Sequence, residues 1–387
     1  MNGLDRRRLL RLLGGVGAAG VTSSLAACVS PSGASDPQSP VRIGLLVPAT
    51  GANKAIGGDL ENGFRLYLET RSDQLAGHPV QLSVEDEGDT VPQGLEALKK
   101  LHSQDVVAVV GVANPDLLRE ARAVIEEKRI PLLSAHGSSF EMASAVYIWR
   151  TAYLNNEPGR AIGQYLRNRD TGRTALVGLR NDLGAELIGG FNNDNGSGTA
   201  PIYVPASANP DKGHLANAVQ EVKNSGARNV FTWLPANYLI PFMQQLPGDI
   251  GVYAPGIVSE GAAVEQLTGA RSLYTAMQYS ADLNNAANRA FSSLFQTRYQ
   301  RSPTAFAVAA YDAAQVLDSA IALVVDEAIN AVNLNLKIGS VGQVVSPRGN
   351  WQFTQARAPQ QKWYLRQIRM DGPVLANVLV SELSTLA

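Results

Sequence analysis

The chain has 387 residues, of which 45% are hydrophobic and only 17% charged, so its composition excludes extensive disorder and allows two domains. Lysine and arginine total 33 against 34 aspartate and glutamate residues, a formal net charge of −1, and this balance does not favour nucleic acid as a partner. The single cysteine, Cys28, excludes an intramolecular disulfide, and the four histidines are scattered, so neither a metal nor a cofactor is expected.

The N-terminal region indicates export. Four arginines within Asp5–Arg11 precede a run of mostly small or apolar residues at 12–27. This run is shorter than the roughly 18–20 residues that a membrane span needs, so it predicts a signal peptide over residues 1–27. Asp5–Arg11 resembles a twin-arginine export signal, although general secretory export stays open.

The only cysteine lies at the end of this signal. Leu25–Cys28 resembles a lipobox, in which the cysteine receives a diacylglycerol and becomes the mature N-terminus. Residues 28–40, rich in Ser, Pro, Gly and Asp, are then expected to be a lipidated tether. The body is expected to lie outside the cytoplasm, anchored to the cell membrane as a lipoprotein. The alternative is an ordinary signal whose cysteine stays unmodified.

From Val41 onward, short apolar runs alternate with helical periodicity. Val41–Val47 has the length and composition of a buried strand. The apolar residues Leu60, Phe64, Tyr67 and Leu68 recur at helical spacing, which predicts one buried helix face. Further strands are expected at 80–84, 106–111 and 130–134, and further helices from Thr90 and around Leu117–Ile125.

A second round of the same alternation begins near Glu157. Strands are expected at 174–179, 202–205, 229–234 and 251–259, long helices at 285–299 and 306–325, and late strands at 349–353 and 362–369. Strands that alternate with helices predict parallel sheets covered on both faces. We therefore expect an α/β fold with two Rossmann-like lobes joined by a hinge. Lobe 1 is expected at 41–153 plus about 281–353, and lobe 2 at 154–280 plus about 354–387.

The loops that follow the strands carry no recognisable catalytic motif. The first of them, Thr50–Asp59, lacks both the phosphate-binding P-loop and the Gly-x-Gly-x-x-Gly spacing of dinucleotide sites. No Gly-x-Ser-x-Gly elbow occurs either. His136 has Ser134 and Ser138 nearby, but sequence adjacency does not make a nucleophile–base pair, so His136 is interpreted as a polar loop residue or a ligand contact. Enzyme activity is not expected.

Several stretches together resemble one family, the type I periplasmic solute-binding proteins of the branched-chain amino acid type, which serve ABC importers. The stretches are 43–51 with Gly57, Asp59 and Gly63, then 85–92, 109–111, 130–134, 310–314 and 346–353. The resemblance covers most of the chain from Val41 onward. It implies a two-lobed Venus-flytrap fold whose ligand lies between the lobes.

The resemblance also implies binding residues in the loops of both lobes. In lobe 1 it implies Thr50, Ile56, Asn114, Ala135 and His136; Asn114 stands near where the family usually has a serine, and His136 near where it usually has a threonine. In lobe 2 it implies Asp182, Trp233 and Glu260. Hydroxyls and backbone N–H groups of lobe 1 bind an amino-acid carboxylate in this family, and an acid at the position of Glu260 pairs with the ammonium. A solvated loop acid is the alternative for both Asp182 and Glu260.

The function implied is an extracytoplasmic, lipid-anchored receptor that binds a small polar solute and delivers it to ABC permease subunits. It is expected to act as a monomer and to touch the membrane through its anchor only. A branched amino acid, an amide, a urea-like compound and an aromatic acid all stay open as ligands. The alternatives are a regulator or sensor that uses the same fold without transport, and an enzyme.

Overall fold

The computed structural model describes residues 39–386 except 170, 195–197, 208–209 and 271. The expected signal peptide, twin-arginine stretch and Cys28 lie outside the described residues. Within the described part of the chain, none of the helices combines the length and the apolar character that crossing a membrane requires.

The first sheet is built from the N-terminal part of the chain. Its strands run in the order β2-β3-β1-β4-β5-β6. They are β1 (Val41–Val47), β2 (Gln74–Leu75), β3 (His78–Asp86), β4 (Ala108–Gly111), β5 (Leu132–Ser134) and β6 (Ile148–Arg150). All neighbours pair in parallel except β2 and β3, and β1 lies between β3 and β4 with Ile43 opposite Leu82 and Ala108. The apolar run of β1 is buried except for Arg42, which confirms it as a central strand.

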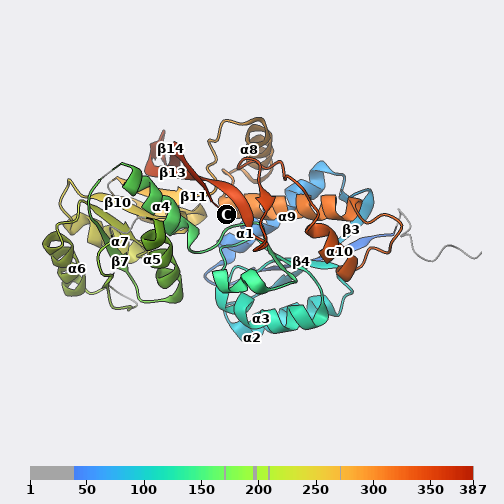
Figure 1. Ribbon diagram of the computed structural model, residues 1–387. Helices are drawn as coiled ribbons and strands as arrows, with labels where there is room; N and C mark the ends of the chain where they lie inside the picture. The colour runs from blue at the N-terminus through green and yellow to red at the C-terminus, as the bar shows by residue number, and fades with distance from the viewer. Residues whose placement is uncertain (1–38, 170, 195–197, 208–209, 271, 387) are drawn as a thin grey trace, which may run out of the picture.

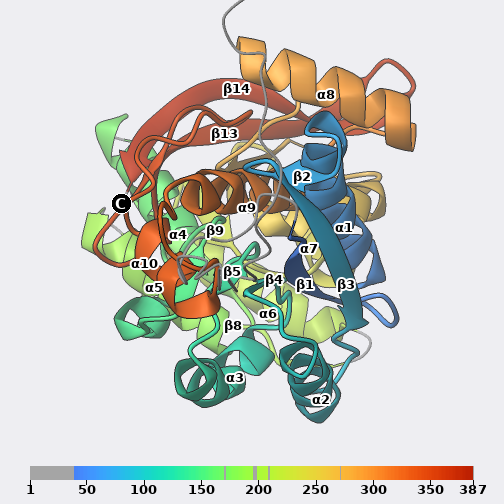
Figure 2. The same cartoon turned by 90° about the vertical axis from the view of Figure 1, so that its right-hand side faces the viewer.

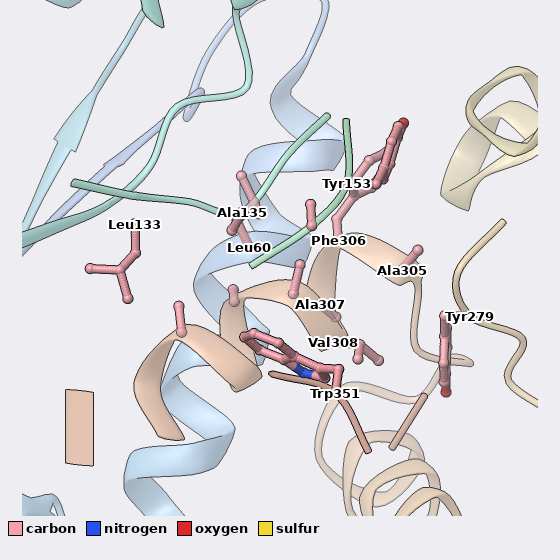
Figure 3. Packing of buried hydrophobic residues seen from close by; sticks show 14 of the residues in the cluster. Leu60, Leu133, Ala135, Tyr153, Tyr279, Ala305, Phe306, Ala307, Val308 and Trp351 are labelled. Atoms are coloured by element: carbon pink, nitrogen blue, oxygen red, sulfur yellow. The ribbon is translucent and has the colours of Figure 1, made fainter. Parts of the chain in front are cut away.

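The helices that pack with this sheet come from both ends of the sequence. They are α1 (Lys54–Thr70), α2 (Val91–His102), α3 (Pro115–Lys128), the short η1 (Phe140–Ser144), α8 (Ala286–Tyr299), α9 (Ala305–Ala322) and α10 (Ala331–Ile338). The predicted face of α1, Leu60, Phe64, Tyr67 and Leu68, is buried. Figures 2 and 3 show α9 beside α1, with Leu60 among the core side chains around the first turn of α9.

The second sheet runs in the order β12-β13-β11-β10-β9-β7-β8, with β14 paired to β13. Its strands are β7 (Thr174–Gly178), β8 (Ile202–Tyr203), β9 (Asn229–Thr232), β10 (Gly251–Pro255), β11 (Leu273–Met277), β12 (Gln352–Phe353), β13 (Pro359–Asp371) and β14 (Val374–Leu386). The strands from β7 to β11 are parallel, whereas β13 is antiparallel to its neighbours. The accompanying helices are α4 (Glu157–Asn168), α5 (Asp182–Asp194), α6 (Lys212–Asn224), α7 (Ala236–Gln245), η2 (Gly256–Ser259) and η3 (Gly261–Leu267).

Figure 1 shows the two sheets with their helices as two halves, and the β13–β14 hairpin lies in the second half and reaches toward the first. The expected strands and helices of both rounds are present; β1 has the expected bounds, and most of the others differ by a few residues. The helix expected after Asp59 already begins at Lys54. β6, β11, α10 and β14 were not predicted from the sequence, and β14 makes the C-terminal pair much longer than expected.

Candidate ligand-binding site

A cavity of about 1220 Å³ lies between elements of the two halves. The first half contributes the first turns of α1 and the loop between α8 and α9, and the second contributes η3 and the end of the β13–β14 hairpin. Its charged lining residues are Lys54, Asp59, Glu260, Glu265, Asp282, Arg301, Arg366 and Asp371. Because each half supplies part of the wall, a molecule bound here contacts both halves.

A buried ion pair lies in the wall of this cavity. The Arg366 side chain on β13 donates from Nη1 to Oε2 of Glu260 at 2.8 Å and to the Tyr279 carbonyl at 3.1 Å. The other carboxylate oxygen of Glu260, Oε1, accepts the backbone N–H of Ala305 at 2.7 Å. Both side chains are almost fully buried. Nε and Nη2 of Arg366 have no hydrogen-bond partner among the described residues.

A second buried acid lies beside the same helix end. Asp59 of α1 forms an ion pair with Arg301 and accepts a hydrogen bond from the Thr304 hydroxyl at 2.9 Å. Thr304 is the N-cap of α9, and its hydroxyl oxygen accepts the Ala307 N–H at 3.2 Å. Burial raises the pKa of Asp59, while the neighbouring Arg301 opposes that rise. Asp59 and Glu260 therefore both lie at the N-terminus of α9, where the helix dipole favours negative charge.

Two of the predicted lobe 1 residues belong to the loop that opens α1. The Thr50 hydroxyl donates to the Asp86 carboxylate, so Thr50 ties this loop to the end of β3. Ile56 is half-buried and packs against the main core. Their neighbours Gly51 and Ala55 line the cavity. The loop is therefore placed at the cavity, although these two side chains are not among its lining residues.

The loop after β4 uses its donors within the protein. The Asn114 side chain caps α3 by accepting the N–H groups of Asp116 and Leu117. The buried carboxylate of Glu87 accepts the N–H groups of Ala113 and Asn114, at 2.9 and 3.0 Å. Burial raises the pKa of Glu87 to about 7. These backbone donors, which the resemblance assigns to a ligand carboxylate, already have an acceptor here.

Ala135 and His136 follow β5 and are buried. Ala135 is part of the main core. The His136 ring stacks on Phe306 of α9 with ring centroids 5.1 Å apart, and its Nδ1 lies 3.3 Å from the Gly137 carbonyl. Burial lowers the pKa of His136 to about 4, so the imidazole is neutral at physiological pH. Its Nε2 has no hydrogen-bond partner among the described residues.

In the second half, Asp182 and Trp233 have partners of their own. Asp182, at the start of α5, accepts a hydrogen bond from Arg119 of α3 at 3.1 Å, which links the two halves. The buried Trp233 donates from Nε1 to the Leu179 carbonyl at 2.7 Å. A Cβ added to Gly178 would lie 2.2 Å from the Trp233 ring, so that glycine leaves room for the indole.

Of the predicted binding residues, Glu260 alone is a lining residue of this cavity, as far as the described residues show. Sequence reasoning missed Arg366 and Arg301, which pair with the two buried acids. Arg366 lies in a predicted strand, but the residues from Trp363 to Arg366 are all buried, so no alternation of buried and exposed positions marked it. In the described residues, no group of three His, Cys, Asp or Glu side chains is placed to hold a metal ion.

Comparison with known proteins identifies the same architecture. A family model described as periplasmic binding protein matches residues 40–373. The Leu/Ile/Val-binding protein homolog 6 of Brucella suis is 21% identical over 273 residues, which is 65% of this chain and 67% of that protein.

Solved structures agree in fold at low sequence identity. A solute binding protein of an ABC transporter from R. palustris, in complex with benzoate, is 22% identical with a TM-score of 0.72, over 89% of this chain and 98% of that one. The leucine binding protein LivK from Thermotoga maritima is 15% identical with a TM-score of 0.76, over 89% and 98%. The branched-chain amino acid binding protein LivJ from Streptococcus pneumoniae, in complex with isoleucine, is 17% identical with a TM-score of 0.74, over 88% and 99%. The predicted two-lobed α/β fold is thereby confirmed.

Proposed function

This chain belongs to the periplasmic binding protein family, and from that membership we propose that it is an extracytoplasmic receptor that binds a small organic solute and passes it to an ABC importer. The observation that carries the proposal is the cavity of about 1220 Å³, whose walls come from both halves and include the buried Glu260–Arg366 pair. Small-ligand sites are concave and hold a few placed polar groups that fix the orientation of the ligand.

The ligand proposed is a small carboxylic acid, either an amino acid or an aromatic acid. Benzoate and isoleucine are the ligands named for two proteins of the same fold. Arg301 and Arg366 line the cavity beside the N-terminus of α9, and each is paired with a buried acid. The proposal of an acid therefore rests on the ligands of these related folds and not on the charge of the cavity wall.

The predicted residues outside the cavity wall are proposed to shape the wider cleft. His136 stacks on Phe306, which directly follows Ala305, the residue whose N–H donates to Glu260. Asp182 bridges to Arg119 across the halves. The loops at the strand ends on either side of the cleft are held in place by Thr50, Ile56, Asn114, Ala135 and Trp233.

Capture is proposed to be a hinge closure of the predicted lobes. A solute that touches both halves only when they are close shifts the population toward the closed state. No covalent step is part of this function. A time-dependent chemical change of a bound compound would instead favour an enzyme.

The membrane attachment is proposed to be a lipid on Cys28, at the end of the expected signal peptide. Cys28→Ala removes the sulfur that would carry the diacylglycerol, so the variant should carry no lipid while its solute binding is unchanged. Mass spectrometry of the wild-type protein extracted from membranes tests this directly. An unmodified Cys28 in that protein would reject the lipoprotein proposal.

A thermal-shift screen against amino acids, amides, urea-like compounds and aromatic acids tests the receptor function. A cognate solute raises the melting temperature, and calorimetry then gives its affinity. Loss of uptake of that solute in cells that lack the gene separates a transport receptor from a sensor with the same fold. A full panel without binding would reject the proposed function.

A further inference from the structure

We propose that Glu260 is a closure latch: its carboxylate joins the second half of the protein to the N-terminus of α9 in the first half, with or without a solute in the cleft. This inference rests on the proposed hinge closure and assigns a residue that drives it. The role differs from the expected binding of a ligand ammonium by Glu260.

The first step is that Glu260 bridges the two halves. It lies between η2 and η3, which accompany the second sheet, and its Oε1 accepts the backbone N–H of Ala305 at 2.7 Å. Ala305 is the first residue of α9, a helix that packs against α1 of the first half. The carboxylate and this N–H can therefore meet only while the halves are close together.

The second step is that the contact is strong for a single hydrogen bond. The Thr304 hydroxyl caps the Ala307 N–H, which leaves the Ala305 N–H to Glu260. A carboxylate at this position also meets the positive end of the helix dipole. The Glu260 side chain is only 4% exposed, so water competes little for it. A hydrogen bond to a charged group changes an equilibrium constant by roughly tenfold to a hundredfold.

The third step is that the second half holds Glu260 in position for this contact. Arg366 of β13 donates from Nη1 to Oε2 of Glu260 at 2.8 Å and to the Tyr279 carbonyl at 3.1 Å. Because β13 belongs to the second sheet, this ion pair moves with the second half and need not break when the cleft opens. The carboxylate is thereby oriented in advance, so closing costs little further side-chain order.

The fourth step is that the backbone beside Glu260 also fits the first half closely. Gly261 has a φ of +58°, and a Cβ built there would lie 3.2 Å from Oδ2 of Asp59 and 3.5 Å from Cγ2 of Thr304. The charge of Asp59 is already paired with Arg301, so Glu260 does not face an unpaired acid across this contact. The two halves are therefore complementary at this point in both shape and charge.

Pulsed electron spin resonance on the empty full chain tests the latch directly. Spin labels at Glu120→Cys on α3 and Asn193→Cys on α5, with Cys28→Ala, report the distance between the halves, because the Arg119–Asp182 pair joins these two helices when the cleft is closed. Both label positions are exposed. We expect the unliganded protein to show a short-distance, closed population beside a longer-distance, open one.

Ala305→Pro removes the donor and leaves every charge in place. Proline is favoured at the first position of a helix, and Thr304 has the extended backbone that a residue before proline requires, with φ −108° and ψ 168°. The variant should lower the ratio of closed to open protein at least about tenfold. The matched control is Ala331→Pro at the first residue of α10, which should leave this ratio within about twofold.

A second pair of variants reaches the latch from the other side if Ala305→Pro fails to fold. Glu260→Ala removes the acceptor and should lower the ratio of closed to open protein by at least the same factor. Its control is Glu265→Ala, since Glu265 is an exposed acid of η3 that also lines the cavity. This control should leave the ratio within about twofold.

Dissociation kinetics give an independent measurement with benzoate and L-leucine as probes. Whichever of the two binds should leave Ala305→Pro at least about tenfold faster than wild type. Its association rate should stay within about threefold, because a solute enters the open form, in which the latch is not made.

The outcomes separate this inference from the proposed function. An empty wild-type protein without a closed population, or a population ratio that Ala305→Pro leaves unchanged, would overturn the latch and keep the receptor function. A loss of L-leucine affinity in Glu260→Ala but not in Ala305→Pro would also overturn the latch and assign Glu260 to the ligand ammonium. Absence of binding to the whole solute panel would reject the receptor function, and the distances in the empty protein would still decide the latch.

Discussion

Arg119 on α3 and Asp182 on α5 form an ion pair at 3.1 Å that joins a helix packed with the first sheet to a helix packed with the second. A second link lies nearby, where Glu186 of α5 accepts the Phe140 N–H at 3.3 Å. Both contacts can exist only while the two halves are close together. They therefore stabilise the closed arrangement and not either half alone.

Loss of the Asp182 carboxylate is expected to weaken solute binding slightly. Both side chains are substantially exposed, 40% for Arg119 and 83% for Asp182, and such pairs contribute about 0–1 kcal/mol. Asp182→Asn should therefore lower affinity at most about fivefold, and the effect should vanish at high salt. Calorimetry at low and high ionic strength measures it. Arg119→Gln should cause the same loss of affinity, and the double variant Arg119→Gln/Asp182→Asn should cause no further loss. A large, salt-independent loss of affinity in Asp182→Asn alone would mean that Asp182 contacts the solute.

Solute binding is expected to compact and stabilise the protein together. A ligand present at about 100 times its dissociation constant adds about 2.7 kcal/mol of apparent stability if it does not bind the unfolded chain. Small-angle scattering should show a smaller radius of gyration at saturation, because the halves approach each other. A confirmed ligand that leaves the radius unchanged would exclude hinge closure as the capture mechanism.

The first-round strands were predictable because burial dictates their composition. β1 and β4 are buried along almost their whole length, so Val41–Val47 and Ala108–Gly111 appear in the sequence as apolar runs. β14 differs, since Val374–Leu386 is mostly half-exposed and has no uniform alternation. Its conformation depends on pairing with β13, and such a partner cannot be inferred from local composition.

The candidate site was only partly predictable for a related reason. Glu260 follows a strand in a loop that the family resemblance identifies, so its position at the cavity was within reach. Its partner Arg366 lies 106 positions away, and no local pattern reveals which acid a buried arginine meets. The same holds for the loop after β4. The capping of α3 by Asn114 follows from an Asn-Pro helix start, but nothing local shows that the backbone N–H groups of Ala113 and Asn114 donate to Glu87.

The contact between α1 and α9 should not tolerate a larger side chain at Gly63. A Cβ built there would lie 1.9 Å from the carbonyl oxygen of Ala307, which is backbone and cannot rotate away. Gly63→Ala should therefore lower the free energy of unfolding by about 1–3 kcal/mol, as overpacked cores do. Urea unfolding measures this change. The control is Gly58→Ala, since nothing lies within 4 Å of a Cβ at Gly58 of the same helix, and equal losses in the two variants would contradict the packing argument.

The contribution of Glu157, at the start of α4, to stability is expected to fall as pH rises from about 4.5 to 7. Burial raises the pKa of this carboxyl to about 7 in the folded protein, while the ordinary value is 4.5, so the folded state binds the extra proton in this window. Ionising the buried group then removes up to about 3 kcal/mol at pH 7.5. Glu157→Gln keeps a neutral acceptor for the Leu154 N–H and should be the more stable protein at pH 7.5 but about equal to wild type at pH 4.5. Urea unfolding at the two pH values tests this. The control is Glu96→Gln, at an exposed position, which should leave the free energy of unfolding unchanged at both pH values. If Glu157→Gln is equally destabilised at both pH values, the carboxyl is ionised in the folded state and the prediction is wrong.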